Sequence, residues 1–408
     1  MTCPANERSG ISPADELSSL RLAFLTSLIP VARPDTGFEI ANAAILKALR
    51  DAGHDVTAIG FLRPGEVPAD PDQAVVVAEA DIENAVVPAG EKLRWLAAAM
   101  RLGMPVACAK LRLIGEGRLV EAVTAHGPFD ALILNSVLLP GAFPELTRIA
   151  PCILVEHNIE HVSADQNADH AGNPVLRWLY RREARLLERL ERGLWDEARF
   201  IWTLAEEDRH VLGPVYREKS CALPLVSGEG AAAMPDDGDA APAFDVGLIG
   251  TWTWGPNLIG LEWFLREICP LLPDDIRIAV AGRVPPELRP PLSVTLVGRV
   301  PSAEHFLRSC RLVALSSRAG TGVQLKTIEA MQLGLPAVAT TLSCRGFTAV
   351  PANFTLADTA ADFARAVMER VAAIRAGDWE RIDGAAFMAE QRIALAEGLA
   401  RGLAAALV

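Results

Sequence analysis

Residues 312–331 read LVALSSRAGTGVQLKTIEAM, and this stretch carries the clearest structural pattern in the chain. Its apolar start is typical of a buried β-strand, which we expect to end near Ser316. Gly320 and Gly322 follow in a loop, where glycine lets the backbone approach a ligand closely. A helix is predicted to begin near Val323, and its free N–H groups and dipole form a site suited to an anion such as a diphosphate.

The spacing within the predicted helix suggests how such an anion is held. Gly322, Lys326 and Glu329 are four and three residues apart, so a helix presents them on one face. Lys326 is then one turn into the helix and within reach of phosphate, while Glu329 is placed to accept hydrogen bonds from a ribose diol. A plain glycine-rich turn with a surface Lys–Glu pair has the same spacing, so the motif alone leaves both interpretations open.

The chain on either side alternates apolar runs with helical patterns. Residues 22–27, 38–52 and 55–61 read as strand, helix and strand, a βαβ unit that implies a parallel sheet. Further strands of the first half are expected at residues 74–78, 131–134, 152–155, 200–204 and 222–226, with a long helix over 174–198. In the second half, strands are expected at 244–249, 276–281, 294–297, 312–316 and 336–340, and helices at 256–269, 303–309, 323–333 and 360–374.

One segment interrupts this alternation. Residues 227–243 read SGEGAAAMPDDGDAAPA, which is typical of a linker. We therefore expect a first domain over residues 20–226 and a second over 244–380, each a doubly wound, Rossmann-like α/β unit. A last, Ala- and Leu-rich segment over 381–408 is predicted to be helical. Two such domains create a cleft, which is the expected active site because ligands bind beyond the carboxyl ends of parallel strands.

The composition excludes several classes of protein. With 408 residues, half of them hydrophobic, the chain can bury two large cores. Its net charge of −12 argues against nucleic acid as a partner, since nucleic-acid-binding proteins normally carry a basic face. The seven scattered cysteines are expected to be reduced thiols. We expect neither a signal peptide nor a transmembrane helix, and a cytoplasmic protein, because the first apolar run is short and lacks a basic flank.

Several segments resemble one known family. Residues 316–340, SSRAGTGVQLKTIEAMQLGLPAVAT, resemble the donor-site signature of the group one family of retaining glycosyltransferases. FDVGLIGTWTWGPNLIGLEWFLREICPLL at 244–272 is similar to the first strand and helix of that family's second domain, and VTLVGRVPSAEHFLRSCRLVAL at 294–315 to its loop beside the nucleobase. VEHNIEH at 155–161 and LAEEDR at 204–209 are similar to a branch of its first domain.

The resemblance covers roughly residues 22–347 and implies the GT-B fold. In this fold two Rossmann-like doubly wound domains face a cleft, and a C-terminal helix crosses back to the first domain. The first domain would bind the acceptor, and the second would bind the nucleotide-sugar.

The resemblance also implies roles for single residues. Glu329 would bind the donor ribose. Lys326 would hold the diphosphate together with the loop residues Gly320, Thr321, Gly322 and Val323. Arg299, Val300 and Arg318 would lie beside the base, the phosphates or the donor sugar. From the first domain, Gly37 would face the donor across the cleft and His157 would lie near the transferring sugar.

The sequence departs from the family pattern at two places. Thr321 stands where the family often has a Glu that contacts the donor sugar, eight residues before Glu329. Residues 251–257, TWTWGPN, lack the family's Arg and Lys after the first strand of the second domain. The diphosphate charge must then be met by the helix N-terminus and one or more of Lys326, Arg318, Arg299 and Arg283. Trp252, Trp254 and Asn257 become candidate donor-site residues, with core packing and helix capping as the alternative.

No metal site is expected. His157 and His161 are four residues apart, but the segment is not HExxH, so a structural or sugar-facing histidine is the preferred interpretation. No acidic pair resembles a metal-holding DxD motif. We expect a metal-independent enzyme without a cofactor, in which the nucleotide-sugar is a substrate.

The combined expectation is a retaining glycosyltransferase that acts by electrostatic stabilisation and positioning. Its partners would be a nucleotide-sugar donor and a glycan, lipid-linked or small-molecule acceptor, and we expect a role in polysaccharide or glycolipid biosynthesis. The alternatives are a nucleotide-sugar epimerase, a phosphorylase, or a two-lobed binding protein without catalysis. The Arg-rich helical residues 181–199 suggest either a peripheral contact at the inner face of the membrane or a solvated face.

Overall fold

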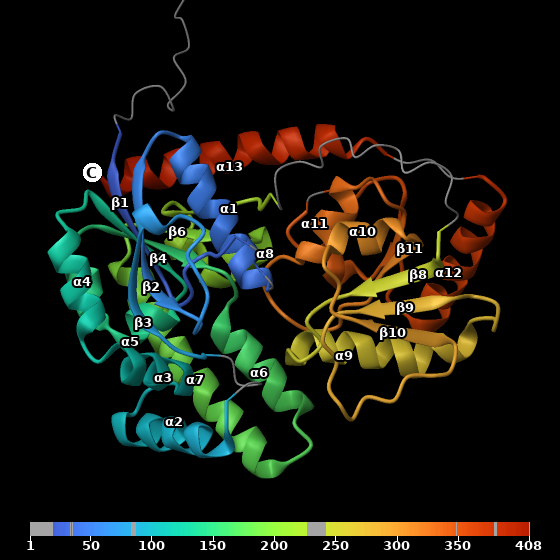
Figure 1. Ribbon diagram of the computed structural model, residues 1–408, viewed down its shortest axis with the longest axis horizontal. Coiled ribbons are helices and arrows are strands. Elements are labelled where there is room, and N and C mark those ends of the chain that lie inside the picture. The colour runs from blue at the N-terminus through green and yellow to red at the C-terminus, as the bar shows by residue number, and fades with distance from the viewer. Residues whose placement is uncertain are drawn as a thin grey trace, which may run out of the picture.

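The computed structural model describes residues 19–32, 34, 36–82, 87–226, 242–347, 349–378 and 382–407. Its elements form two groups, each built around one parallel sheet with helices packed on it (Figure 1). The predicted linker falls almost entirely on residues 227–241, which lie outside the described residues.

The first sheet has seven strands in the order β3-β2-β1-β4-β5-β6-β7. All neighbouring strands are parallel. The strands are β1 (Arg21–Thr26), β2 (Asp55–Leu62), β3 (Ala74–Glu79), β4 (Ala131–Asn135), β5 (Cys152–Glu156), β6 (Phe200–Thr203) and β7 (Ser220–Ala222). The order changes direction between β1 and β4, and in such sheets the crevice beyond the carboxyl ends of these two strands is where ligands bind.

The helices of this half connect the strands. They are α1 (Gly37–Asp51), α2 (Ala89–Leu102), α3 (Val106–Gly115), α4 (Arg118–His126), α5 (Leu138–Ala142), α6 (Glu160–His170), α7 (Pro174–Glu197) and α8 (Glu206–Leu212). The start of α1 is fixed by a capping box: the Thr36 hydroxyl accepts from the Glu39 N–H, and the Glu39 carboxylate accepts from the Thr36 N–H. This box sets Gly37 as the first residue of the helix.

The second sheet has six strands in the order β10-β9-β8-β11-β12-β13, again all parallel. The strands are β8 (Phe244–Ile249), β9 (Ile278–Ala281), β10 (Val294–Gly298), β11 (Cys310–Leu315), β12 (Ala337–Ala339) and β13 (Phe354–Leu356). The helices are α9 (Gly255–Trp263), which continues into a π-helical turn (Phe264–Ile268), α10 (Ala303–Arg308), α11 (Leu325–Gln332) and α12 (Ala360–Arg375). The strand order reverses between β8 and β11, so the loops that follow these two neighbouring strands lie side by side at the carboxyl edge of the sheet.

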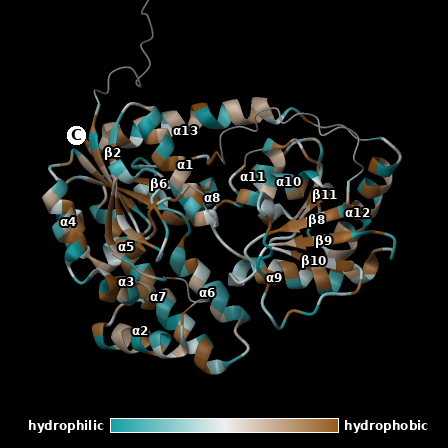
Figure 2. Cartoon of the chain, viewed as in Figure 1, coloured by the Kyte–Doolittle hydropathy of each residue, from teal (hydrophilic) through white to brown (hydrophobic). Residues whose placement is uncertain are grey.

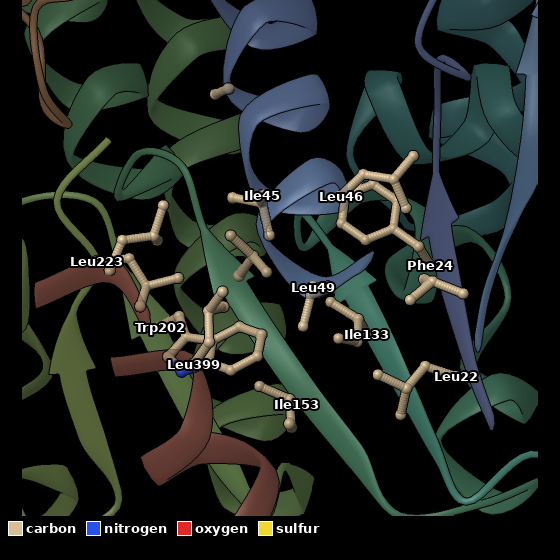
Figure 3. Packing of buried hydrophobic residues seen from close by; sticks show 14 of the residues in the cluster. Leu22, Phe24, Ile45, Leu46, Leu49, Ile133, Ile153, Trp202, Leu223 and Leu399 are labelled. Carbon is tan, nitrogen blue, oxygen red and sulfur yellow. The ribbon is translucent and has the colours of Figure 1, made fainter. Parts of the chain in front are cut away.

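Apolar side chains cover both faces of each sheet, which is why the strands read as continuous hydrophobic runs. Figure 2 shows the strands of both sheets as mostly hydrophobic, with hydrophilic residues on the outer helices. In the first sheet, one face packs on α1 and the C-terminal helix (Figure 3), through Leu22, Phe24, Ile45, Leu46, Leu49, Ile133, Ile153, Trp202, Leu223 and Leu399. Each such buried side chain contributes about 1.5–3 kcal/mol.

The C-terminal helix α13 (Gly384–Ala406) runs from the second domain back across the first, as expected from the resemblance (Figure 1). Its start lies against α11, since a Cβ on Gly384 would be 1.8 Å from the carbonyl oxygen of Gln332. Its end packs on Trp202 of β6, whose indole N–H donates to the Gly398 carbonyl at 3.0 Å. Gly402 permits this approach, because a Cβ there would lie 2.4 Å from the indole nitrogen.

Some predicted boundaries were wrong. The strand expected at 222–226 is β7, which ends at Ala222, and the helix expected from Val323 begins at Leu325. The helices α2 to α6, the helix α8 and the strand β13 were not predicted. These differences leave the predicted fold class, two doubly wound α/β units, unchanged.

Candidate functional site

The glycine-rich loop follows β11 and is anchored at its start. The Ser317 N–H donates to the Ser343 hydroxyl at 3.0 Å, and the Ser316 hydroxyl donates to the Gly260 carbonyl at 3.1 Å. Gly320 and Gly322 have φ values of 110° and 74°, a left-handed conformation that favours glycine. The two glycines are therefore required by the backbone conformation of the loop, which is a different reason from the close approach of a ligand that the sequence suggested.

The first domain makes the closest approach to this loop. A Cβ on Gly322 would lie 2.4 Å from the His157 carbonyl oxygen. The Gly320 N–H donates to the Gln166 side chain at 2.8 Å, and the Gly322 N–H donates to Asp208 at 2.7 Å. Two of the N–H groups expected to hold the diphosphate thus bind first-domain side chains in this structure.

Thr321 also faces the first domain. Its side chain is buried, and its hydroxyl oxygen accepts a hydrogen bond from the Ile159 N–H at 3.1 Å. The hydroxyl of Ser163 lies 3.0 Å away. The residue that replaces the family's glutamate therefore connects the loop to the start of α6.

Lys326 is the second residue of α11, and its side chain reaches the segment that follows β8. Its ammonium group donates to the Asn257 side-chain oxygen at 3.4 Å and lies 5.6 Å from the centre of the Trp252 ring. Asn257 is itself held by the Thr251 carbonyl at 3.2 Å. Burial lowers the pKa of Lys326 to about 8. The cation-free stretch 251–257 thus orients Lys326.

Glu329 lies one turn further along α11 and is half-buried. Burial raises the pKa of its carboxyl to about 7. Within the part of the chain that the structure describes, its carboxylate accepts no hydrogen bond, which is unusual for a desolvated acid. Such a group is suited to receive hydroxyl donors from a ligand.

His157 follows β5 and is part of a buried polar cluster with Asn135. Its Nε2 lies 2.7 Å from the Asn135 side-chain oxygen, and Phe38 packs on its ring at 4.7 Å between centroids. Burial lowers the pKa of His157 to about 3, so the ring is neutral and Nε2 donates to Asn135. Gly37 lies beside this group and faces α11, since a Cβ on it would be 3.3 Å from Leu325.

The remaining predicted residues lie around this centre. Trp254 caps α9 and is 40% exposed, and its ring lies 3.8 Å from where a Cβ on Gly320 would be. Trp252, by contrast, is a core residue whose indole N–H donates to the Ala281 carbonyl at 2.8 Å. Val323 packs against the core of the first domain and Val300 against that of the second.

The three candidate arginines are dispersed. Arg283 and Arg299 are exposed and follow the neighbouring strands β9 and β10, where the Gly282 N–H donates to the Gly298 carbonyl at 2.7 Å. The guanidinium carbon of Arg318 lies 4.7 Å from the centre of the Trp263 ring, which belongs to α9. The same guanidinium donates a hydrogen bond to the Asp358 carbonyl at 2.9 Å. Of the candidate cations, Lys326 is the one that the structure places on the same helix face as Glu329.

The first-domain partners of the loop were not predicted from the sequence; they are Ser163, Gln166 and Asp208. Asp208 lies within LAEEDR, but its spacing gave no sign of its role because its partner Gly322 is 114 residues away. In the described ranges, no group of three or more His, Cys, Asp or Glu side chains is arranged to hold a metal. His161 is instead paired with the buried Glu191. Across the same residues, no helix has the length and apolarity needed to cross a membrane.

Comparisons with known proteins agree with this arrangement. Residues 243–372 match the family model described as glycosyl transferases group 1. The fold is similar to that of Anabaena HepE solved with UDP and glucose, with a TM-score of 0.58 and 14% identity, over 94% of this chain and 99% of that one. It is also similar to WaaG, a glycosyltransferase involved in lipopolysaccharide biosynthesis, with a TM-score of 0.58 and 13% identity, over 92% and 95% of the two chains.

No curated protein sequence matches the chain. At such low sequence identity, the solved structures show the fold alone. The family match over residues 243–372 includes the glycine-rich loop, Lys326 and Glu329. The chain therefore has the two-domain GT-B fold, and residues 243–372 in its second half match the family of glycosyl transferases group 1.

Proposed function

We propose that this glycosyltransferase moves a sugar from a nucleotide-sugar donor to a glycan, lipid-linked or small-molecule acceptor. The observation that carries the proposal is the face of α11, where Lys326 and Glu329 lie one turn apart, both desolvated. A buried cation beside a helix N-terminus suits a diphosphate, and a carboxylate without a protein donor suits a ribose diol. HepE, which shares the fold, was solved with UDP-glucose.

The proposed chemistry needs no metal ion. Lys326 and the first N–H groups of α11 stabilise the negative charge that develops on the leaving diphosphate. His157 is neutral and fixed by Asn135, and it is the first-domain residue that we propose to face the transferring sugar. A diphosphate oxygen then assists removal of the acceptor proton on the same face, so the anomeric configuration of the donor is retained.

A panel of nucleotide-sugars tests donor binding. We expect one of UDP-, GDP-, ADP- and TDP-glucose to raise the melting temperature by about 3 °C or more at saturating concentration, because a ligand of the native state stabilises it by mass action. The free sugar and the matching nucleoside monophosphate are controls. No shift with any donor would remove the basis of the proposal.

Turnover with the selected donor tests the reaction. NMR of the product should show the donor's anomeric configuration, and EDTA should leave the rate unchanged. Release of free sugar without an acceptor product, or formation of an epimer, would assign the protein a different activity. The proposed role in polysaccharide or glycolipid biosynthesis is supported by the fold shared with WaaG.

A lipid-linked acceptor would bring the enzyme to the inner face of a membrane. The first turns of α7 expose Val175, Leu176 and Trp178, and α2, which is tied to α7 by a hydrogen bond from Arg182 to the Ala99 carbonyl, exposes Leu93. The proposed peripheral contact places these apolar side chains among lipid head groups. The middle of α7 is a solvated face instead, where Arg181 pairs with Asp165 and Asp169, and Arg192 with Glu188.

Vesicle sedimentation tests this contact. We expect the protein to bind vesicles that contain phosphatidylglycerol, and the double variant Leu176→Ser, Trp178→Ser to bind at least about five times less, because the inserted apolar area is lost. Val215→Ser is the matched control, since Val215 is 81% exposed on another part of the domain. Equal binding by both variants would exclude the start of α7 as the contact.

A further inference from the structure

Helix α8 of the first domain holds two segments of the second domain through a pair of acids. The Asp208 carboxylate accepts from the Gly322 N–H at 2.7 Å and forms an ion pair with Arg345. The neighbouring Glu207 accepts from the Gly346 N–H at 2.9 Å. We call Glu207, Asp208, Gly322, Arg345 and Gly346 the α8 clasp.

Asp208 is fully buried, and burying an ionised carboxylate costs several kcal/mol unless hydrogen bonds and a counter-charge compensate it. Both compensating groups, the Gly322 N–H and Arg345, come from the other domain. In the described ranges, Asp208 is also the sole carboxylate that pairs with Arg345. The contact is therefore satisfied only when the two domains are closed around the glycine-rich loop.

The position of Gly322 connects this contact to the proposed donor site. Gly322 precedes α11, and Lys326 lies four residues further along the chain. The Gly322 backbone is pressed between Asp208 and the His157 carbonyl oxygen, which leaves no room for a Cβ. Any shift of this glycine moves the start of α11 relative to His157.

We propose that Asp208, together with Arg345, is a positioning residue that sets the glycine-rich loop and α11 against the first domain in the closed enzyme. The proposal rests on the function proposed above. Donor-binding groups lie on the second domain and the acceptor side on the first, so the clasp governs the geometry of transfer more than nucleotide affinity. A misplacement of about 1 Å between reacting groups can cost about 100-fold in rate.

The test separates rate from affinity. Asp208→Ala should lower kcat by about 100-fold while the Kd for UDP, used as the probe, changes by less than about threefold. Asp208→Asn keeps an oxygen for the Gly322 N–H and loses the ion pair, so we expect partial rescue, to a loss of about 10-fold. Arg345→Gln should match Asp208→Asn, and the double variant Asp208→Asn, Arg345→Gln should be no worse than either, because the two act as one pair.

Asp245→Asn is the matched control. Asp245 is also buried and bound to an arginine, Arg375, at 2.9 Å, but it lies at the amino end of β8, away from the cleft. We expect it to lower the melting temperature while kcat stays within about twofold. A similar kcat for Asp208→Ala and wild type, or additive losses in the double variant, would overturn the clasp. If Asp208→Ala does not fold, the single and double conservative variants decide. A wild-type enzyme without UDP binding or turnover would instead contradict the proposed function.

Discussion

Replacing Lys326 with methionine is expected to lower kcat by about 100- to 1000-fold, with the protein still folded. Methionine retains the length and the packing on Trp252 but removes the charge 5.6 Å from that ring. Removing one group that stabilises developing negative charge in a preorganised site typically costs this much. The measurement is single-turnover transfer from saturating donor, which isolates the chemical step from binding.

Comparison with other cations identifies which charge meets the diphosphate. Arg318→Met should cost far less, because Arg318 is committed to Trp263 and the Asp358 carbonyl. Lys47→Met, at an exposed position of α1, is the surface control, and its kcat should equal that of wild type. If Arg318→Met is more damaging than Lys326→Met, the assignment of Lys326 is wrong.

The pH dependence gives an independent readout. The pKa of Lys326 is about 8 in the free enzyme, and the cationic form is the one that meets phosphate. kcat/KM for the donor should therefore fall as the pH rises through about 8, since this parameter reports groups of the free enzyme. The Lys326→Met variant should lack this fall.

The sequence predicted the second domain well because its signals are local. The strand over residues 312–316, the two glycines and the Lys–Glu spacing on the following helix are all properties of neighbouring residues. The positive φ values of Gly320 and Gly322 are likewise a property of the loop's own backbone. The helix nevertheless begins two residues later than predicted, because Gln324 takes an extended conformation as its N-cap.

The first domain was less predictable where its elements lack a clear apolar stripe. Helix α2 exposes Leu93, Met100 and Leu102, so its apolar residues do not mark a single buried face. The strand β7, like β13 of the second domain, has three residues and is defined by its pairing with the neighbouring strand, β6 for β7 and β12 for β13. Such short edge strands depend on partners that are distant in sequence.

The inter-domain contacts were not predictable from sequence patterns at all. Thr321 was interpreted through the glutamate that it replaces, whereas its hydroxyl binds the Ile159 N–H, 162 residues away. Gln166 and Asp208 reach the loop across similar separations. Spacing rules describe one element, so contacts between two domains require the fold.

Replacing Glu329 with alanine is expected to weaken donor binding by about 100-fold. Hydrogen bonds to a charged group contribute about 1.5–3 kcal/mol each, and even two at the lower limit correspond to a factor of about 100. The loss should appear in the Kd for UDP by calorimetry, because the ribose is bound in the ground state as well as in the transition state. The kcat at saturating donor should change much less.

A modified nucleotide shows whether the ribose is the partner. 2′-Deoxy-UDP should bind the wild-type enzyme about 10-fold or more weakly than UDP, and Glu329→Ala should bind both nucleotides equally. Glu262→Ala is the matched control, because Glu262 of α9 is paired with the exposed Arg266, and it should retain wild-type affinity and discrimination. Unchanged UDP affinity in a folded Glu329→Ala variant would refute the ribose role.

The protonation state of Glu329 adds a further condition. Burial raises its pKa to about 7, and only the ionised carboxylate accepts hydrogen bonds from both hydroxyls. In the free enzyme, kcat/KM for the donor should therefore fall as the pH drops through about 7, and Glu329→Gln should abolish this fall. Deprotonation of Lys326 lowers kcat/KM above about pH 8, and protonation of Glu329 lowers it below about pH 7. The enzyme should therefore have its highest kcat/KM between these two values, where both groups are charged.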